Sequence, residues 1–216
     1  MTTIYLVRHG ETEANRQFRF QGCTDLPLTP DGLEQAERLA EALKDIPFDF
    51  AYSSPLPRAW NTANIVNKFH NVPLMPDPAL LEICGGLFEG QKVDVVKEKW
   101  PEELRLWNEE YWKFVGPGLD EGVETKHYQL EKALWRMVRN HPGQTLLLSA
   151  HGCIQRAFNT IIKGWPVQRQ GEFPWGFNCS YSAAEFEEDG TIRPLAINEA
   201  KHLEGFRVWL FDRPED

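Results

Sequence analysis

Short apolar runs alternate along the chain with longer segments in which apolar residues recur at helical spacing. Runs rich in leucine and β-branched residues predict buried strands at 4–7 and 145–150, and the run with two phenylalanines at 48–53 predicts another strand. Thr29 and Pro30, an N-cap and a first helical residue, open a helix that continues through Leu33, Ala36, Ala40 and Leu43. Further helices are expected at 57–69, 124–141 and 153–163. This alternation predicts an α/β fold with a largely parallel sheet and helices on both faces.

The last third of the chain has a different pattern. Two strand-like runs at 179–186 and 192–197 flank Asp189-Gly190, a dipeptide that favours a hairpin, so the sheet is expected to have an antiparallel edge. The proline-containing segment 72–78 predicts an extended loop or an edge strand, and residues 208–211 either add a strand or pack against the sheet.

The segment 91–123 is rich in aromatic residues set among many charges. The aromatic residues are Trp100, Trp107, Tyr111, Trp112 and Phe114. We expect two short helices and a glycine-proline loop here, forming a small helical insertion within a single domain that spans 1–216. Such a cluster more often forms core than a ligand-binding face.

Composition narrows the class of protein. With 216 residues, 42% of them hydrophobic and 25% charged, the chain suits one globular domain. A net charge of −9 argues against nucleic acid and anionic membranes as partners. There is no membrane-length apolar run and no secretory leader, which predicts a cytoplasmic protein. Cys23, Cys84, Cys153 and Cys179 are widely spaced, so we expect reduced thiols and no zinc site.

Candidate chemistry gathers where the predicted strands end. One strand runs into Arg8-His9-Gly10, another into His151-Gly152, and a third into Ser53-Ser54 shortly before Arg58. The carboxyl ends of parallel strands meet at one edge of a sheet, so these residues should converge there. Arginine forks and helix N-termini bind phosphate, which predicts an anion pocket in an otherwise acidic protein.

A neutral histidine in such a pocket could attack phosphorus. Neighbouring cations would stabilise the charge on the equatorial oxygens, and a carboxylic acid would protonate the leaving alkoxide. Glu82 and Glu89, in a glycine-rich stretch, are the candidates for this acid, and Glu89 also suits a purely structural loop carboxylate. We expect no metal and no cofactor.

Five motifs in order resemble the histidine phosphatase superfamily, also called the phosphoglycerate mutase-like family. They are 6–12 with Asn15, 21–32, 53–63, 82–90, and His151-Gly152. The resemblance covers most of the chain and is weakest at 91–143. It implies a three-layer α/β/α sandwich, with 91–123 forming a lid over the site.

The resemblance also implies roles for single residues. His9 would be the nucleophile that becomes phosphohistidine, and Glu82 would protonate the leaving group. Arg8, Arg58 and His151 would hold the phosphoryl group.

Four further positions would contact the substrate in this resemblance, namely Asn15, Gln21, Gly22 and Gly152. The implied activity is metal-independent hydrolysis of a small phosphorylated metabolite. The aromatic insertion suggests a partly apolar leaving group, a hypothesis that rests on Trp107 and Trp112. The sequence does not indicate an oligomeric state.

The sequence departs from the family's pattern at three places. Leu81 stands where many members have arginine, Ala150 where serine is common, and 123–125 read Val-Glu-Thr rather than Gly-Glu-Ser. These departures leave the substrate open. Three alternatives also remain: a phosphoglycerate mutase using the same histidine, a non-catalytic binding member of the fold, and a metal hydrolase.

Overall fold

The computed structural model describes residues 1–206, and these form one six-stranded sheet in the order β3-β2-β4-β1-β5-β6. The strands are β1 (Thr2–Arg8), β2 (Phe50–Ser53), β3 (Leu74–Pro76), β4 (Thr145–Ala150), β5 (Tyr181–Phe186) and β6 (Ile192–Glu199). The first four run parallel, with β1 and β4 side by side at the centre. β5 pairs antiparallel with β1 and with β6, so the predicted antiparallel edge is confirmed.

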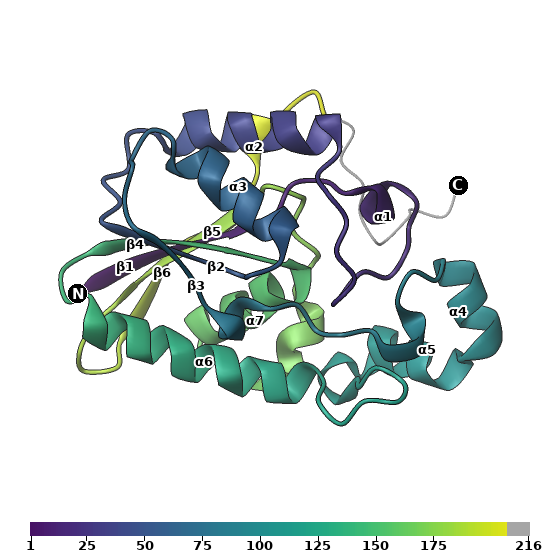
Figure 1. Cartoon of the computed structure of the whole chain (residues 1–216). Coiled ribbons are helices and arrows are strands. Elements are labelled where there is room, and N and C mark those ends of the chain that lie inside the picture. The colour runs from purple at the N-terminus through teal and green to yellow at the C-terminus, as the bar shows by residue number, and fades with distance from the viewer. Residues whose placement is uncertain (207–216) are drawn as a thin grey trace.

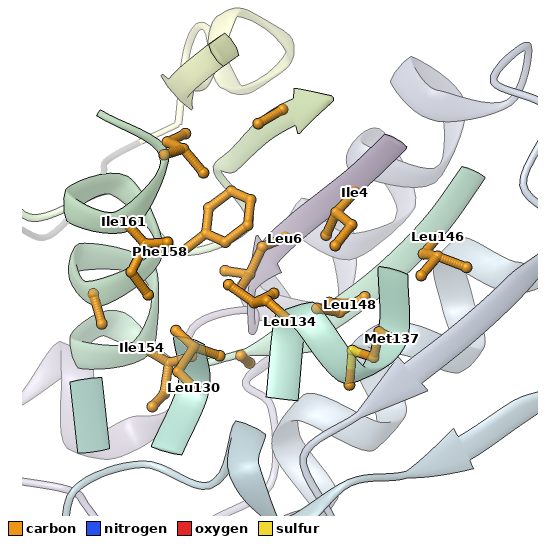
Figure 2. Close-up of a cluster of buried hydrophobic side chains, with 14 of the residues drawn as sticks. Ile4, Leu6, Leu130, Leu134, Met137, Leu146, Leu148, Ile154, Phe158 and Ile161 are labelled. Atoms are coloured by element: carbon orange, nitrogen blue, oxygen red, sulfur yellow. The ribbon is translucent and has the colours of Figure 1, made fainter. Parts of the chain in front are cut away.

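Two pairs of helices cover the two faces of the sheet (Figure 1). Helices α2 (Pro30–Leu43) and α3 (Pro57–Asn67) pack on one face, and α6 (Val123–Asn140) and α7 (Gly152–Ile162) on the other. Figure 2 shows the second core, in which side chains of α6 and α7 meet those of β1 and β4. The three-layer α/β/α sandwich expected from the sequence is therefore confirmed.

The first long helix begins where the sequence predicts. Thr29 Oγ1 accepts a hydrogen bond from the N–H of Gly32 at 3.0 Å, and Pro30 occupies the first turn. Leu39 lies fully buried on the apolar face. Leu33, which shares the helical spacing of the core residues, is instead 45% exposed because it lies at the margin of the buried stripe.

The segment 91–123 contains α4 (Val93–Lys99) and α5 (Pro101–Glu109), which lie at one end of the molecule (Figure 1). Its apolar side chains form a core of their own with Phe20, Ile83 and Phe88. The segment thus packs against the loops that lead away from the strand ends. Residues 208–211, where one more strand was an option, lie outside the described residues.

The expectation of four reduced cysteines is wrong for one pair. Cys23 and Cys84 form a disulfide, with their Cα atoms 4.9 Å apart and a sequence separation of 61. The spacing gave no sign of this pairing, because the fold alone brings the two loops together. Cys153 and Cys179 are buried free thiols, as expected.

Among the described residues, none of the helices combines the length and apolar character needed to cross a membrane.

We expect loss of the disulfide to destabilise the fold. Closing a loop of this length stabilises a protein by about 2–4 kcal/mol, which the chain-entropy model attributes to restriction of the unfolded chain. Thermal unfolding should therefore occur at a lower temperature for a Cys23→Ser, Cys84→Ser double variant. Wild-type protein should show the same decrease with reductant, and the variant should show none. Four titratable thiols in unfolded wild-type protein without reductant would contradict the pairing.

Candidate active site

The central strands bring two histidines together. In the register of β1 and β4, Arg8 lies opposite Ala150, so the next residue of each strand, His9 and His151, leaves the same edge of the sheet. Their ring centroids are 5.2 Å apart, and the N–H of His9 donates to the carbonyl of Ala150 at 3.0 Å. Both rings are buried. The convergence that the sequence predicts is therefore present.

The tautomer of His9 follows from its contacts. Its Nδ1 lies 2.7 Å from the carbonyl oxygen of Gly10, which can only accept, so Nδ1 carries the proton. Nε2 is then an unprotonated nitrogen, and Arg58 Nε donates to it at 3.3 Å. Gly10 must be glycine because a Cβ there would lie 2.4 Å from the carbonyl oxygen of Gly32.

The surroundings keep both histidines neutral. Burial lowers the pKa of His9 well below its usual value, and the charges of Arg58 and Arg8 lower it further. The pKa of His151 is lowered by the same causes, with burial again the largest. A neutral imidazole with an unprotonated Nε2 is a competent nucleophile near pH 7.

The two arginines are buried with backbone carbonyls as hydrogen-bond acceptors. Arg58, in the first turn of α3, is 0% exposed, and its terminal nitrogens donate to the carbonyls of Gly22 at 2.7 Å and Thr24 at 2.9 Å. Arg8 donates through Nη1 to the carbonyl of Gly176, and its buried Nε has no partner among the described residues. Buried guanidinium groups retain their charge, so this edge of the sheet is strongly electropositive.

His151 also has a nitrogen without a partner. Its Nε2 lies 2.8 Å from Ser54 Oγ, and its buried Nδ1 contacts no polar atom of residues 1–206. Ser54 Oγ accepts from the N–H of Leu56 at 3.3 Å, which leaves its hydroxyl proton for His151 Nε2. We therefore assign the proton of the neutral ring to Nδ1. Nδ1 of His151 and Nε of Arg8 are then two buried donors that an anion can satisfy.

Glu82 lies beside this anion pocket and is only 8% exposed. Its carboxylate accepts from the N–H of Ile83 at 2.9 Å and of Cys153, at the start of α7, at 3.1 Å. Burial raises the pKa of Glu82, and these hydrogen bonds only partly oppose the increase. A carboxyl with a raised pKa can deliver a proton.

A cavity opens between these groups. Seven of the nine residues predicted from the sequence line it, namely Arg8, His9, Asn15, Gln21, Gly22, Glu82 and Gly152. Arg58 and His151 contact His9 from its sides. All nine predicted residues are therefore brought together.

The position of Asn15 depends on a short helix that the sequence did not predict, α1 (Glu13–Arg16). Thr12 is its N-cap, and the side chains of Thr12 and Asn15 form a capping box. Asn178 donates to Asn15 Oδ1 at 3.2 Å and to the carbonyl of His9 at 2.9 Å.

The outer wall of the cavity is apolar and comes from four separate segments. Its side chains are Phe20, Ile83, Trp107, Phe114 and Trp175. Trp107 of α5 stacks on Trp175 with ring centroids 5.5 Å apart. The polar floor and the aromatic wall together suit a ligand with a phosphate at one end and apolar atoms at the other.

Sequence reasoning placed Ser54 at this edge of the sheet but gave it no role, and it missed two further residues of the site, Trp175 and Asn178. Trp175 and Asn178 come from the loop before β5, where no periodicity or motif pointed to a function. Trp175 lies so close to the start of α7 that a Cβ on Gly152 would be 3.1 Å from its ring.

Residues 1–206 contain no group of three or more histidine, cysteine or acidic side chains arranged to hold a metal ion.

A family model and individual relatives both match nearly the whole chain. The sequence model of the histidine phosphatase superfamily (branch 1) matches residues 4–199. Phosphoserine phosphatase 1 of Hydrogenobacter thermophilus is 32% identical over 211 residues, which cover 96% of this chain and 97% of that protein. A probable phosphoglycerate mutase, GpmB of Escherichia fergusonii, is 30% identical over 87% of this chain and 86% of its own length.

Among solved structures, Bacillus stearothermophilus YhfR superposes with a TM-score of 0.88 and 29% sequence identity. The match covers 94% of this chain and 100% of that one. The phosphoglycerate mutase-like fold expected from the sequence is confirmed.

We expect Ser54→Ala to disturb the tautomer of His151 while leaving the fold intact. The ring would lose the donor at Nε2, so the proton would distribute over both nitrogens and Nδ1 would donate less often. The ¹⁵N chemical shifts of His151 should show a pure Nδ1–H form in the wild type and a mixture in the variant. Ser53→Ala, which removes a neighbouring buried hydroxyl that contacts no histidine, is the control. An Nε2–H form in the wild type would overturn the assignment.

Proposed function

The chain belongs to the histidine phosphatase superfamily, branch 1, and we propose that it hydrolyses small phosphomonoesters through a phosphohistidine on His9. It is an enzyme of the phosphoric monoester hydrolase class, as the phosphatases among its relatives indicate. One observation carries the proposed mechanism: His9 presents an unprotonated Nε2 to a pocket of buried cations that has room for an anion.

In the first step, His9 Nε2 attacks the phosphorus atom and the P–O bond to the leaving group breaks. Glu82 gives its proton to the departing oxygen, so the leaving group departs as a neutral alcohol. Arg8, Arg58 and the Nδ1–H of His151 stabilise the charge on the three equatorial oxygens. The products of this step are phosphohistidine, ionised Glu82 and the free alcohol.

In the second step, a water molecule attacks the phosphohistidine. Glu82, now a carboxylate, takes a proton from the water, and the N–P bond breaks. Inorganic phosphate leaves, and His9 and Glu82 return to their starting states. The same carboxyl thus acts as an acid and then as a base.

The substrate we propose is a small phosphorylated metabolite with apolar atoms near its phosphate. Relatives are named as phosphatases of phosphoserine and of α-ribazole phosphate. Trp107 and Phe114 belong to the segment 91–123 and line the same cavity as His9, which supports a role for this segment as a lid. The sequence-based hypothesis of a partly apolar leaving group rested on Trp107 and Trp112. Trp107 lines the cavity, whereas Trp112 lies under the ammonium group of Lys113.

A phosphoglycerate mutase is the second candidate, favoured by the identity with the GpmB protein. A mutase must keep the phosphoryl group and exclude water. Dependence of the activity on a bisphosphoglycerate would favour it.

We propose a cytoplasmic location and no nucleic-acid partner. The disulfide Cys23–Cys84 is an observation against this location, because disulfides are rare in reducing compartments. Alkylation of the free thiols at the moment of cell lysis shows whether this pair is oxidised in the cell.

We expect wild-type protein to release phosphate from a panel of sugar phosphates, phosphoglycerates, phosphoserine, nucleotides and an aryl phosphate in the presence of EDTA. His9→Ala should lower the rate by at least about a thousandfold, because no nucleophile remains. Phosphate release is measured colorimetrically, and acid-labile labelling of the wild type traps the intermediate.

The outcomes separate the candidates. Loss of activity with EDTA would support a metal hydrolase, and activity only with bisphosphoglycerate a mutase. No release from any substrate under any condition would indicate a non-catalytic member of the fold.

We expect Trp107→Ala to change the substrate ranking and Trp112→Ala to leave it unchanged. Removing the indole from the cavity wall should raise KM for an aryl phosphate by about tenfold, the equivalent of roughly 1.4 kcal/mol of apolar contact. The KM for glycerol phosphate, which has far less apolar surface than an aryl phosphate, should change little. Equal effects of the two substitutions would rule out a substrate contact at Trp107.

A further inference from the structure

Glu89 is a half-buried carboxylate that joins two loops of the site. Its Oε1 accepts from the N–H groups of Gly22 at 3.0 Å, Cys23 at 3.0 Å and Gly85 at 2.7 Å. Its Oε2 accepts from Gly22 at 3.2 Å and Thr24 at 3.1 Å. One side chain therefore binds three successive N–H groups of the turn 22–24, together with one from its own loop.

The opposite side of the same turn faces Arg58. The carbonyls of Gly22 and Thr24, whose N–H groups Glu89 binds, accept from the two terminal nitrogens of Arg58. The turn thus lies between a carboxylate and a guanidinium group, with its donors toward one and its acceptors toward the other. Its orientation decides where the two acceptors for Arg58 lie.

The third nitrogen of Arg58 contacts the proposed nucleophile. Nε donates to His9 Nε2 at 3.3 Å while Nη1 and Nη2 are held by the turn. A planar guanidinium group with two nitrogens fixed has its third direction fixed as well. The contact chain from Glu89 to His9 therefore contains two links, the turn 22–24 and Arg58.

Position 22 of this turn has no space for a side chain. A Cβ on Gly22 would lie 2.0 Å from the carbonyl oxygen of Ile83 and 2.6 Å from Glu89 Oε1. Only glycine lets the turn approach both the carboxylate and the loop that carries Glu82.

We propose that Glu89 is a positioning residue, which fixes the guanidinium group of Arg58 against His9 by holding the turn 22–24. This inference rests on the proposed function and extends it to a side chain that touches neither nucleophile nor leaving group. It also decides between the two roles that the sequence left open for Glu89, in favour of the structural one.

The ionisation of Glu89 agrees with this role. Burial raises its pKa, but hydrogen bonds from Thr24, Gly85 and Cys23 outweigh burial and hold the pKa below its usual value. Glu82 in the same loop has a raised pKa. Glu89 therefore stays ionised and accepts hydrogen bonds, whereas Glu82 can hold and donate a proton.

The test compares Glu89→Gln with the wild type. A glutamine presents an amide donor to a set of N–H donors, so the turn should shift and take the acceptors of Arg58 with it. We expect kcat/KM to fall by about 10- to 100-fold, to the same extent for an alkyl and an aryl phosphate, since Arg58 binds the phosphoryl group and not the leaving group. Glu82→Gln should instead affect the alkyl phosphate far more, because a phenolate leaves without a proton.

The pH profile separates positioning from a general loss of stability. The charged and titratable groups around His9 are Arg8, Arg58, His151 and Glu82. Arg58 lowers the pKa of His9, so its displacement should raise that pKa and move the acid limb of kcat/KM to higher pH. Loss of the negative charge of Glu89 by itself would move the limb the other way. The direction of the shift therefore identifies the cause.

Three further variants complete the experiment. Glu199→Gln is the matched control, because this carboxylate also accepts from two backbone N–H groups, at the end of β6 and away from the site. Arg58→Ala should remove most of the effect of Glu89→Gln when the two are combined. Glu89→Asp, which keeps the charge but reaches less far, should give an intermediate loss and serves if the glutamine variant does not fold.

Each outcome decides the proposal. An additive double variant, an unmoved or lowered acid limb, or full activity in both Glu89 variants would overturn it. Equal loss in Glu199→Gln would overturn it too. Failure of the proposed function would look different, because then wild-type protein itself would show no His9-dependent release of phosphate.

Discussion

Two guanidinium groups are buried at the carboxyl edge of the sheet, and their closest hydrogen-bond acceptors are backbone carbonyls. Arg8 donates to Gly176 and Arg58 to Gly22 and Thr24, while the nearest carboxylate oxygen to Arg58, on Asp25, is 3.6 Å away. Carbonyl groups satisfy the donors without cancelling the charge, and the ion pair of Arg58 with Asp25 compensates only one of the two guanidinium groups in part. A buried charge without full compensation is costly, and a bound anion relieves that cost. The neutral state of His9 and the unpartnered nitrogens both follow from this arrangement, and they underlie the proposed binding of phosphate.

Such an arrangement requires rigid loops, because a mobile loop would let water reach the guanidinium groups. The loops here are held by several independent means. The disulfide between Cys23 and Cys84, the carboxylate of Glu89 and the close approach at Gly22 all join the turn 22–24 to the loop that carries Glu82. The aromatic core of segment 91–123 packs against the same loops. The contacts that stabilise this region are therefore the same contacts that fix the geometry of the site.

Most of the fold and most of the site residues could be predicted from the sequence. Strands and helices with strong periodicity were found, and β4 matches its predicted limits at Thr145–Ala150. His9, His151 and Arg58 were found because their positions after strands and at a helix start determine their place in a parallel sheet. What could not be predicted depends on tertiary contact alone. The disulfide, the exposure of Leu33, and the arrival of Trp175 and Asn178 at the site leave no trace in local spacing.

The pairing of β1 with β4 has a consequence for the order of events when the chain is made. His9 is synthesised near the beginning, but its partner strand ends only at Ala150, and the second histidine follows at once. All intervening segments must be present before the two central strands can meet. A growing chain therefore carries His9, the proposed nucleophile, for most of its synthesis without the other residues of the site arranged around it. Hydrolysis of a phosphomonoester can begin only after β1 and β4 have paired. Catalytic activity is therefore a reporter of completed folding.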